Sequence, residues 1–291
     1  MSANFQSSCA YLIHDTGQAF RRRFGRQIAS LGFTQTHWRI LGFLNRTGPI
    51  GQSRIAELLV LHKVPVGIAL NELEREGWIT RVPMAADRRA RVVELAPRAQ
   101  PVVANLKAEF DALEARMMAS LGHQAARRLP KALRKIRDAL RDESLENIEV
   151  KDESPLWLLL DCSRHLMRRL DVRLEGLGFT RTQWFVLNAL YHAGDQTQTD
   201  LARQLDMSAA QLGKLLDQLQ QEGWIERHPD LLDRRVKRLD IRPEQRRKIA
   251  SIRRQFDHSH NTLLDVLDTA DRGELARSLE CLRSYLRKDC A

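Results

Sequence analysis

The sequence predicts a mainly α-helical chain with two winged helix-turn-helix units, each carrying a small β-hairpin wing. Three observations lead to this fold. The stretch "LGFTQTHW" at residues 31–38 returns as "LGFTRTQW" at residues 177–184, a displacement of 146 residues. In each copy two short amphipathic helices follow in tandem. Two β-prone stretches separated by a polar loop come next, and a hairpin in that place is a wing.

The displacement of 146 residues holds without a gap through most of the chain. From Leu31 to Pro97, about 25 of roughly 67 positions are identical to the positions 146 residues later, far more than chance gives for a fixed register. Each copy has the length of an ordinary domain. The sequence therefore predicts one unit at residues 1–145 and a second at 155–291, joined by an acidic linker at 146–154.

Composition limits the classes of function. The chain has 291 residues, of which 43% are hydrophobic and 29% charged, as in globular domains. Its longest apolar runs, such as "LWLLL" at residues 156–160, are far shorter than a membrane span, and the N-terminus has no signal-peptide pattern. We therefore expect a cytoplasmic protein without a membrane partner. The net charge of +10 favours a polyanionic partner but does not identify one.

The four cysteines form no CxxC motif and no regular framework. They are Cys9, Cys162, Cys281 and Cys290. This scatter fits a reducing compartment. Two interpretations stay open: either the thiols are inert, or Cys9 or Cys162, each near the start of a unit's first helix, senses redox state.

An amphipathic helix opens each unit, at about residues 8–30 and 155–176. The motif "GFT" follows, in which Thr34 or Thr180 is placed to cap the next helix. That next helix carries a tryptophan three residues before a leucine. The expected role of both tryptophans is core packing.

Two short helices in tandem follow in each unit, with the spacing of a helix-turn-helix. They are "QSRIAELLV" and "VPVGIALNELERE" in the first unit, and "QTDLARQL" and "SAAQLGKLLDQLQQE" in the second. The second helix of each pair ends at "EGWI". There Gly77 or Gly223 can adopt the left-handed backbone conformation that terminates a helix.

The expected wings come directly after these glycines. Their strands should cover about Trp78–Val82 and Arg91–Leu95, then Trp224–His228 and Val236–Ile241. Each pair encloses a "DRR" loop, and arginines at a wing tip suit the negative potential of a narrow minor groove. The candidate DNA-contacting residues of the wings are Arg88, Arg89, Arg91, Arg234, Arg235 and Lys237.

The aspartates of the two loops have an expected structural role. Asp87 should brace Arg89, and Asp233 should brace Arg235. The alternative is a solvated surface ion pair worth less than about 1 kcal/mol.

The order of these elements, in both halves, resembles the multiple-antibiotic-resistance regulator (MarR) family. The matching elements are "TQTHWRIL", "EREGWITR" and "DRRARVVELAP", then "TRTQWFVL", "QQEGWIER" and "DRRVKRLDIRP". The resemblance covers nearly all of both units and implies N- and C-terminal dimerisation helices. It also implies binding to palindromic DNA and release by phenolic or other small ligands or by thiol oxidation. The chain resembles two protomers of this family fused end to end.

The two recognition helices differ in chemistry. The second offers polar side chains able to contact base edges or phosphates, namely Ser208, Gln211 and Lys214. The equivalent positions of the first are His62, Pro65 and Ile68, with Lys63 beside them. Ile68 cannot donate a hydrogen bond, although it could contact a thymine methyl group. The first unit therefore binds DNA weakly, contacts a different half-site, or serves mainly as scaffold, and its wing arginines favour retained phosphate contact.

An apolar stripe near the end of each unit has alternating spacings of four and three residues. Its members are Leu129, Leu133, Ile136 and Leu140, then Leu275, Leu279, Leu282 and Leu286. On pattern alone the stripe packs within its own unit or against partner helices. The family resemblance favours a helical dimerisation layer. Between the last helix of the first unit and the first helix of the second lies "RDESLENIEVKDESP", and roughly a dozen of its residues can span up to about 40 Å. We therefore expect one chain to form its own pseudo-twofold dimer, with a homodimer as the alternative.

These observations predict a sequence-specific regulator of transcription that binds double-stranded DNA, with repression as the expected mode. The resemblance implies a small aromatic ligand as a second partner. No phosphate loop, nucleophile elbow or catalytic triad is visible, so we expect no enzyme, catalytic residue, cofactor or metal. The alternative is a winged-helix protein-interaction module that has lost DNA binding, a hypothesis motivated by the apolar recognition helix of the first unit.

Overall fold

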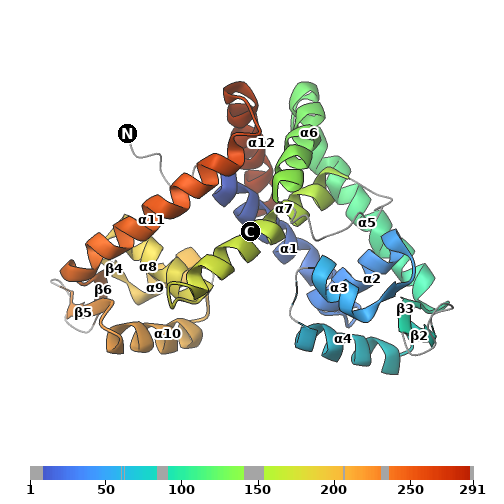
Figure 1. The fold of residues 1–291 in the computed structure, drawn as a ribbon, viewed down its shortest axis with the longest axis horizontal. Helices are drawn as coiled ribbons and strands as arrows, with labels where there is room; N and C mark the ends of the chain where they lie inside the picture. The colour runs from blue at the N-terminus through green and yellow to red at the C-terminus, as the bar shows by residue number, and fades with distance from the viewer. Residues whose placement is uncertain are drawn as a thin grey trace. The chain divides into compact units, whose positions relative to one another are not determined.

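A computed structural model gives the fold for residues 9–59, 61, 63–83, 91–140, 154–205, 207–230 and 236–288, with the side chains of 259–261 not described. The described part is mainly helical (Figure 1). Its helices are α1 (Cys9–Ser30), α2 (Gln35–Thr47), α3 (Gln52–Leu58), α4 (Lys63–Arg75), α5 (Ala99–Ala119), α6 (His123–Leu140), α7 (Pro155–Glu175), α8 (Arg181–Ala193), α9 (Gln198–Leu205), α10 (Ala209–Gln221), α11 (Pro243–Leu264) and α12 (Thr269–Lys288). Its strands are β1 (Ile50–Gly51), β2 (Ile79–Pro83), β3 (Arg91–Leu95), β4 (Gln196–Thr197), β5 (Ile225–Pro229) and β6 (Lys237–Ile241).

Both predicted helix caps are confirmed. Thr34 Oγ1 accepts a hydrogen bond from the backbone N–H of His37 at 3.1 Å, and Thr180 Oγ1 accepts one from that of Gln183 at 3.2 Å. The side chains of His37 and Gln183 in turn accept a hydrogen bond from the backbone N–H of the capping threonine. Each of these capping boxes satisfies two donors that a helix start otherwise leaves unpaired, and so fixes where α2 and α8 begin.

Each wing belongs to a three-stranded antiparallel sheet, in the order β1-β3-β2 and β4-β6-β5. The predicted wing strands are confirmed to within a residue or two. In the register, Arg81 lies opposite Val93, and Arg227 lies opposite Leu239. The short strands β1 and β4 were not predicted, because two residues are too few to show an alternating pattern.

The chain divides into two compact units. Unit 1 comprises Met1–Arg168 and Leu263–Ala291, and unit 2 comprises Arg169–Thr262. Unit 1 therefore holds the whole first winged helix together with α12 and the first part of α7. The compact units do not coincide with the sequence repeats. The first part of α7 and the whole of α12 belong to the second repeat, but they pack with the first.

The two predicted apolar stripes lie in one hydrophobic core, inside unit 1. Helix α12 packs against both α1 and α6, as Figure 1 shows for the red, blue and green helices. The stripe residues, each 3% exposed or less, are Leu129, Leu133, Ile136 and Leu140 of α6 and Leu275, Leu279, Leu282 and Leu286 of α12. Burial of a leucine side chain stabilises by about 1.5–3 kcal/mol, so both stripes contribute to the stability of the layer.

Two hydrogen bonds in this layer relate equivalent positions of the repeats. Thr16 Oγ1 of α1 donates to the backbone oxygen of Leu279 in α12 at 3.2 Å. Cys162 Sγ of α7 donates to the backbone oxygen of Leu133 in α6, also at 3.2 Å. Thr16 and Cys162 are 146 residues apart, and so are Leu133 and Leu279. Each repeat's first helix therefore makes the same contact with the other repeat's last helix.

The first helices of the repeats meet at a third pair of equivalent positions. A Cβ atom on Gly17 of α1 would lie 3.2 Å from Ser163 Oγ of α7, and these residues are again 146 apart. Glycine allows this close approach of the helices, because a Cβ atom at this position would require Ser163 to shift by a few tenths of an ångström. Ser163 also accepts a hydrogen bond from Arg21 Nη2 at 3.1 Å.

The tryptophans of α2 and α8 are core residues, as predicted. Trp38 is 6% exposed in unit 1 and packs against Phe24, with ring centroids 5.4 Å apart. Trp184 is 2% exposed in unit 2 and packs against Phe256 at 5.1 Å. Along the described stretches, none of the helices has the length and apolarity to cross a membrane.

Candidate nucleic-acid interface

Each unit contains the two helices of a helix-turn-helix, α3 and α4 in unit 1 and α9 and α10 in unit 2. The second helix of each pair ends at a glycine with positive φ, 73° at Gly77 and 78° at Gly223, which confirms the predicted terminators. In both cases the backbone N–H of the following tryptophan bonds back into the helix, to Leu73 at 2.8 Å and to Leu219 at 2.9 Å. This closed end sets the direction in which the wing leaves the recognition helix.

The predicted contact residues of α10 lie together at its exposed N-terminal end. Ser208 is the N-cap, and its Oγ accepts a hydrogen bond from the backbone N–H of Gln211 at 3.3 Å. The side chains of these two residues are also bonded, at 3.0 Å. Lys214 lies one turn further along and is exposed. This end of α10 therefore carries an amide and a cation with free access to solvent.

The predicted contact residues of α4 are exposed too, but they are chemically different. Lys63 and Pro65 begin the helix, and Ile68 is 55% exposed. The neighbouring Val64 is 74% exposed. His62 lies outside the described residues. The described part of this surface is thus largely apolar, where its counterpart on α10 is polar.

Arg91 and Lys237 occupy the same place in the two wings. They are the first residues of β3 and β6, they are exposed, and they lie opposite Pro83 and Pro229. The remaining wing candidates and their expected braces lie outside the described residues, and these are Asp87, Arg88, Arg89, Asp233, Arg234 and Arg235. Where the structure describes them, both wings begin their second strand with an exposed cation.

One arginine in each wing connects the wing to its recognition helix. Neither arginine was predicted from the sequence. Arg81 of β2 donates to Asn71 Oδ1 of α4 at 2.8 Å and is paired with Glu74. The equivalent residue of β5, Arg227, donates to Gln220 of α10 at 2.9 Å and is paired with Asp217. Each guanidinium therefore connects its wing strand to two side chains of the recognition helix. The sequence does indicate this arginine, because it ends the matching motifs "EGWITR" and "EGWIER" of both repeats.

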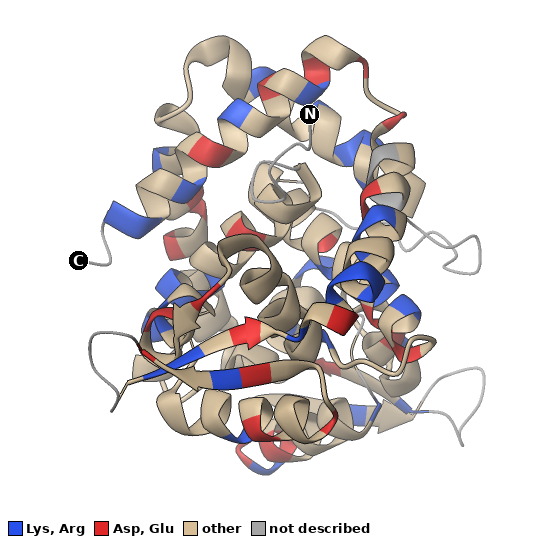
Figure 2. Cartoon of the chain, turned by 90° about the vertical axis from the view of Figure 1, so that its left-hand side faces the viewer, with Lys and Arg blue, Asp and Glu red and all other residues tan. Residues whose placement is uncertain are grey.

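Charges of both signs lie on the strands and helices of unit 2 (Figure 2). At the base of its wing, Arg238 of β6 is paired with Asp230 and lies 3.5 Å from a carboxylate oxygen of Asp195. His228 Nε2 lies 3.1 Å from the other oxygen of Asp195. The first repeat has Val92 in the place of Arg238. The two wings are therefore held by different chemistry at the same backbone positions.

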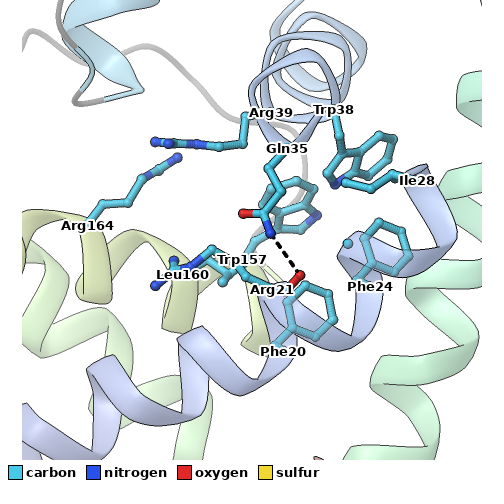
Figure 3. Close-up of a pocket in the computed structure, with 11 residues that line it drawn as sticks. Phe20, Arg21, Phe24, Ile28, Gln35, Trp38, Arg39, Trp157, Leu160 and Arg164 are labelled. Carbon is cyan, nitrogen blue, oxygen red and sulfur yellow. Dashed lines mark hydrogen bonds between the residues drawn. The ribbon is translucent and has the colours of Figure 1, made fainter. Parts of the chain in front are cut away.

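A pocket of unit 1 lies between α1, α2 and the start of α7 (Figure 3). Its empty volume is about 440 Å³, including the space at its open mouth. Aromatic rings form much of its wall. The ring of Trp157 in α7 stacks on that of Phe110, with centroids 4.7 Å apart, and its centroid lies 6.4 Å from that of Trp38. Gln35 crosses one side and donates to the backbone oxygen of Arg21 at 3.2 Å. The lining of the pocket is thus largely apolar and aromatic, with arginines and Gln35 at its edges.

Cations are concentrated around this pocket. Burial lowers the pKa of the Arg39 guanidinium to about 10. Burial also lowers the pKa of Arg164, and the neighbouring cations Arg39, Arg46 and Arg21 lower it further. One carboxylate, Asp161, is paired with Arg164, but the Nε of Arg164 is buried and has no hydrogen-bond acceptor within the described part of the chain. A buried donor without a partner is costly, so the site favours an anion.

Two of the cysteines are buried and held as thiols. Burial raises the pKa of Cys162 to about 12, and burial raises the pKa of Cys9 as well. Because the thiolate is the reactive form, both should be inert at neutral pH. Cys281 is exposed on α12, and Cys290 lies outside the described residues.

We expect a thiol reagent to separate these cysteines by rate. In a Cys290→Ser background at pH 8, Ellman's reagent should modify Cys281 within minutes, and should modify Cys9 and Cys162 only when the chain unfolds. The absorbance at 412 nm, followed with and without denaturant, checks this. Rapid reaction of Cys162 in the folded chain would show that its environment opens and would restore a redox-sensing role.

Two helix-turn-helix pairs, each followed by an antiparallel wing, define the class of this molecule as a winged-helix protein. Two family models match it, both described as the MarR family, one at residues 31–90 and one at residues 179–237. Each repeat therefore carries a MarR segment, and the chain is a tandem of two MarR-family units. By family it is a winged-helix transcriptional regulator and not an enzyme.

Solved structures of similar proteins cover about half of the chain. A MepR–DNA complex from S. aureus is 25% identical, with 45% of this chain and 96% of that chain covered and a TM-score of 0.40. MepR from S. aureus in its DNA-binding conformation is 24% identical, with the same coverage and a TM-score of 0.41. Wild-type MarR from E. coli, without ligand, is 21% identical, with 33% and 70% covered and a TM-score of 0.32.

Proposed function

We propose that this chain is a sequence-specific regulator of transcription, a repressor in its expected mode, that binds double-stranded DNA in the cytoplasm with both winged helices. The observation that carries the proposal is the repeated placement of an exposed recognition helix beside a wing that begins with a cation, in a tandem of MarR-family units. A second helix of a helix-turn-helix fits the major groove, and a basic wing beside it reaches phosphates or the minor groove.

The proposed contacts follow from exposure and charge. In unit 2 the bases are contacted by Gln211 and Lys214, with Ser208 holding the start of α10. Lys237 and Arg91 contact phosphate, as do the loop arginines that precede them in the sequence. The net charge of +10 adds long-range attraction to DNA and makes binding depend on salt.

We further propose that one chain supplies both halves of the DNA-binding dimer. The reciprocal bonds from Thr16 to Leu279 and from Cys162 to Leu133 support this, because equivalent residues exchange equivalent contacts in a twofold interface. The burial of both leucine stripes in one core supports it as well. A second chain is then not needed to cover either stripe.

We expect the chain to have a mass of 33.5 kDa in solution. The apolar faces that dimerise in separate protomers are already covered within the chain, so little driving force for association remains. Light scattering after size-exclusion chromatography, from low to high micromolar concentration, measures this. A stable species of twice that mass at low micromolar concentration would contradict intrachain pairing.

The alternative function is a winged-helix module that binds a protein and not DNA. The exposed apolar residues of α4, Val64 and Ile68, are the observation that favours it. An electrophoretic shift on the region upstream of the chain's own gene, titrated with salt, separates the two. Binding that falls steeply with salt and prefers some sequences supports the regulator, whereas absence of binding at low salt refutes it.

We propose that regulation comes from a small aromatic anion bound in the pocket of α1, α2 and α7. The apolar lining of the pocket, which includes Phe20, Phe24 and Trp38, suits an aromatic ring, and Arg39 and Arg164 suit its charge. The pocket joins α2 of the winged helix to α7 of the helical layer. A ligand that prefers one angle between these helices therefore changes DNA affinity.

Benzoate should quench the tryptophan fluorescence of the chain, and Arg164→Met should weaken this binding by about fivefold, the effect of losing one net hydrogen bond. Benzyl alcohol, which has the ring without the charge, serves as the control and should bind wild type and variant equally. Equal weakening of both compounds would mean that Arg164 shapes the pocket and does not bind the charge. Lack of saturable quenching by benzoate would contradict the proposed ligand class.

A further inference from the structure

The exposed face of α4 carries an apolar pair that nothing in the described part of the chain covers. Val64 is 74% exposed and Ile68 is 55% exposed. They are four residues apart, so their side chains are neighbours on one face of the helix. In α10 the equivalent positions hold Ala210 and Lys214. The side chains of Val64 and Ile68 are therefore available for an apolar contact with a partner.

Exposed cations lie at both ends of α4, on either side of the apolar pair. Lys63 precedes the apolar pair, and Arg75 ends the helix with a side chain that is 75% exposed despite an ion pair to Glu76 at 3.7 Å. Each of the two glutamates within α4 has a partner. Glu72 lies 2.9 Å from His37 Nε2, and Glu74 is paired with Arg81. The charges around the apolar pair are therefore of both signs and largely paired, so the choice of partner rests on the position of the pair in the recognition helix.

The position of the pair in the helix matches a place where DNA presents apolar groups. The first two turns of a recognition helix approach base edges in the major groove. The apolar group exposed there is the C5-methyl of thymine. Val64 and Ile68 occupy those two turns, and they have methyl groups and no hydrogen-bonding atoms in their side chains.

We propose that the first repeat specifies its half-site through thymine methyl groups contacted by Val64 and Ile68, and not through hydrogen bonds to base edges. The inference rests on the proposed DNA binding and adds to it the chemical basis of specificity. Its half-site is consequently rich in A·T pairs with thymines at fixed positions. The second repeat contacts its half-site with the polar side chains of α10.

Replacing single thymines by deoxyuridine tests the proposal, because it removes one methyl group and leaves every hydrogen-bonding atom of the base pair in place. In a preferred site selected from random DNA, substitution at one or two thymines of one half-site should weaken wild-type binding by about three- to fivefold each, the effect of exposing one methyl group. Val64→Ala and Ile68→Ala should abolish that sensitivity. Lys214→Ala should retain it, as the matched control in the other repeat.

Two outcomes overturn the inference and leave DNA binding intact. One is a wild-type affinity that is unchanged on every singly substituted site. The other is a sensitivity to deoxyuridine that persists in both α4 variants, which would assign the methyl contacts to other residues and leave this face for a protein partner. Loss of thymine specificity with retained affinity for unselected DNA in Ile68→Ser, checked for folding by thermal unfolding, would support the proposal independently. Failure of the wild type to bind any DNA at low salt would refute the proposed function itself.

Discussion

Leu133→Ala should lower the free energy of unfolding by about 2–5 kcal/mol. Leu133 is fully buried in α6, within the core that contains the leucine stripes of both repeats. The substitution removes three carbon atoms and leaves a cavity that rigid neighbouring helices can fill only in part. Its backbone oxygen, which accepts the bond from Cys162, is retained. Urea unfolding followed by circular dichroism measures the loss.

Leu31→Ala is the matched control, because Leu31 is 46% exposed and its truncation should change stability by less than about 0.5 kcal/mol. Leu279→Ala, at the equivalent position of the second repeat, should cost about as much as Leu133→Ala. If both stripes are covered within one chain, the midpoint of unfolding is independent of protein concentration. A loss at Leu133 no larger than at Leu31 would show that α6 is not part of the core.

The features predictable from the sequence are those decided by neighbouring residues. A capping box specifies a helix start without reference to the rest of the chain. In this box Thr34 accepts a bond from the backbone of His37, three residues later, and the side chain of His37 accepts one from the backbone of Thr34. The glycines of "EGWI" specify a stop in the same way, since Gly77 and Gly223 adopt a conformation that costs other residues more. The repetition of each signal 146 residues later removed much of the ambiguity that one copy leaves.

Features that depend on a distant partner were not decided by the pattern. The stripe of α6 was equally compatible with packing inside its own repeat and packing against another. The structure places it beside α12 and α7, through the bond from Cys162 to Leu133. A periodic stripe shows that a face is buried, but it does not show which element buries it. The sequence therefore did not predict that the helices of the second repeat are divided between two compact units.

The candidate site was predictable in its helices and less so in its supports and its pocket. Exposure of Gln211 and Lys214 follows from the helical period of α10, because buried leucines occupy the other face. Arg81 gave a signal only through its identity in both copies. The pocket was not predictable, because Arg164 reaches it from a helix of the other repeat, and its role depends on burial beside Arg39, which no linear pattern indicates.

Two fused repeats are free to diverge where two identical protomers are not, and the recognition helices have diverged. The amide of Gln211 and the ammonium of Lys214 can form hydrogen bonds to base edges that discriminate between base pairs by about 1–3 kcal/mol each. At the equivalent positions of α4, Pro65 and Ile68 have no side-chain donor. Apolar contacts discriminate less, because each involves only a methyl group. The preferred DNA site should therefore be an imperfect palindrome.

Gln211→Ala and Lys214→Ala should each relax base preference at one or two positions of a single half-site and weaken binding there by about 1–3 kcal/mol for a well-formed contact. Ile68→Ala should cost less than about 1 kcal/mol and affect only the other half-site, whose centre should lie about one helical turn away. Selection of binding sites from random DNA with wild type and each variant measures both effects. Neither exposed side chain of α10 supports the core, so equal thermal stability of all three variants serves as the control for folding. A symmetric palindrome, equally specified in both halves and relaxed in both by Lys214→Ala, would require two copies of α10 on one site. It would therefore contradict the use of both repeats of a single chain.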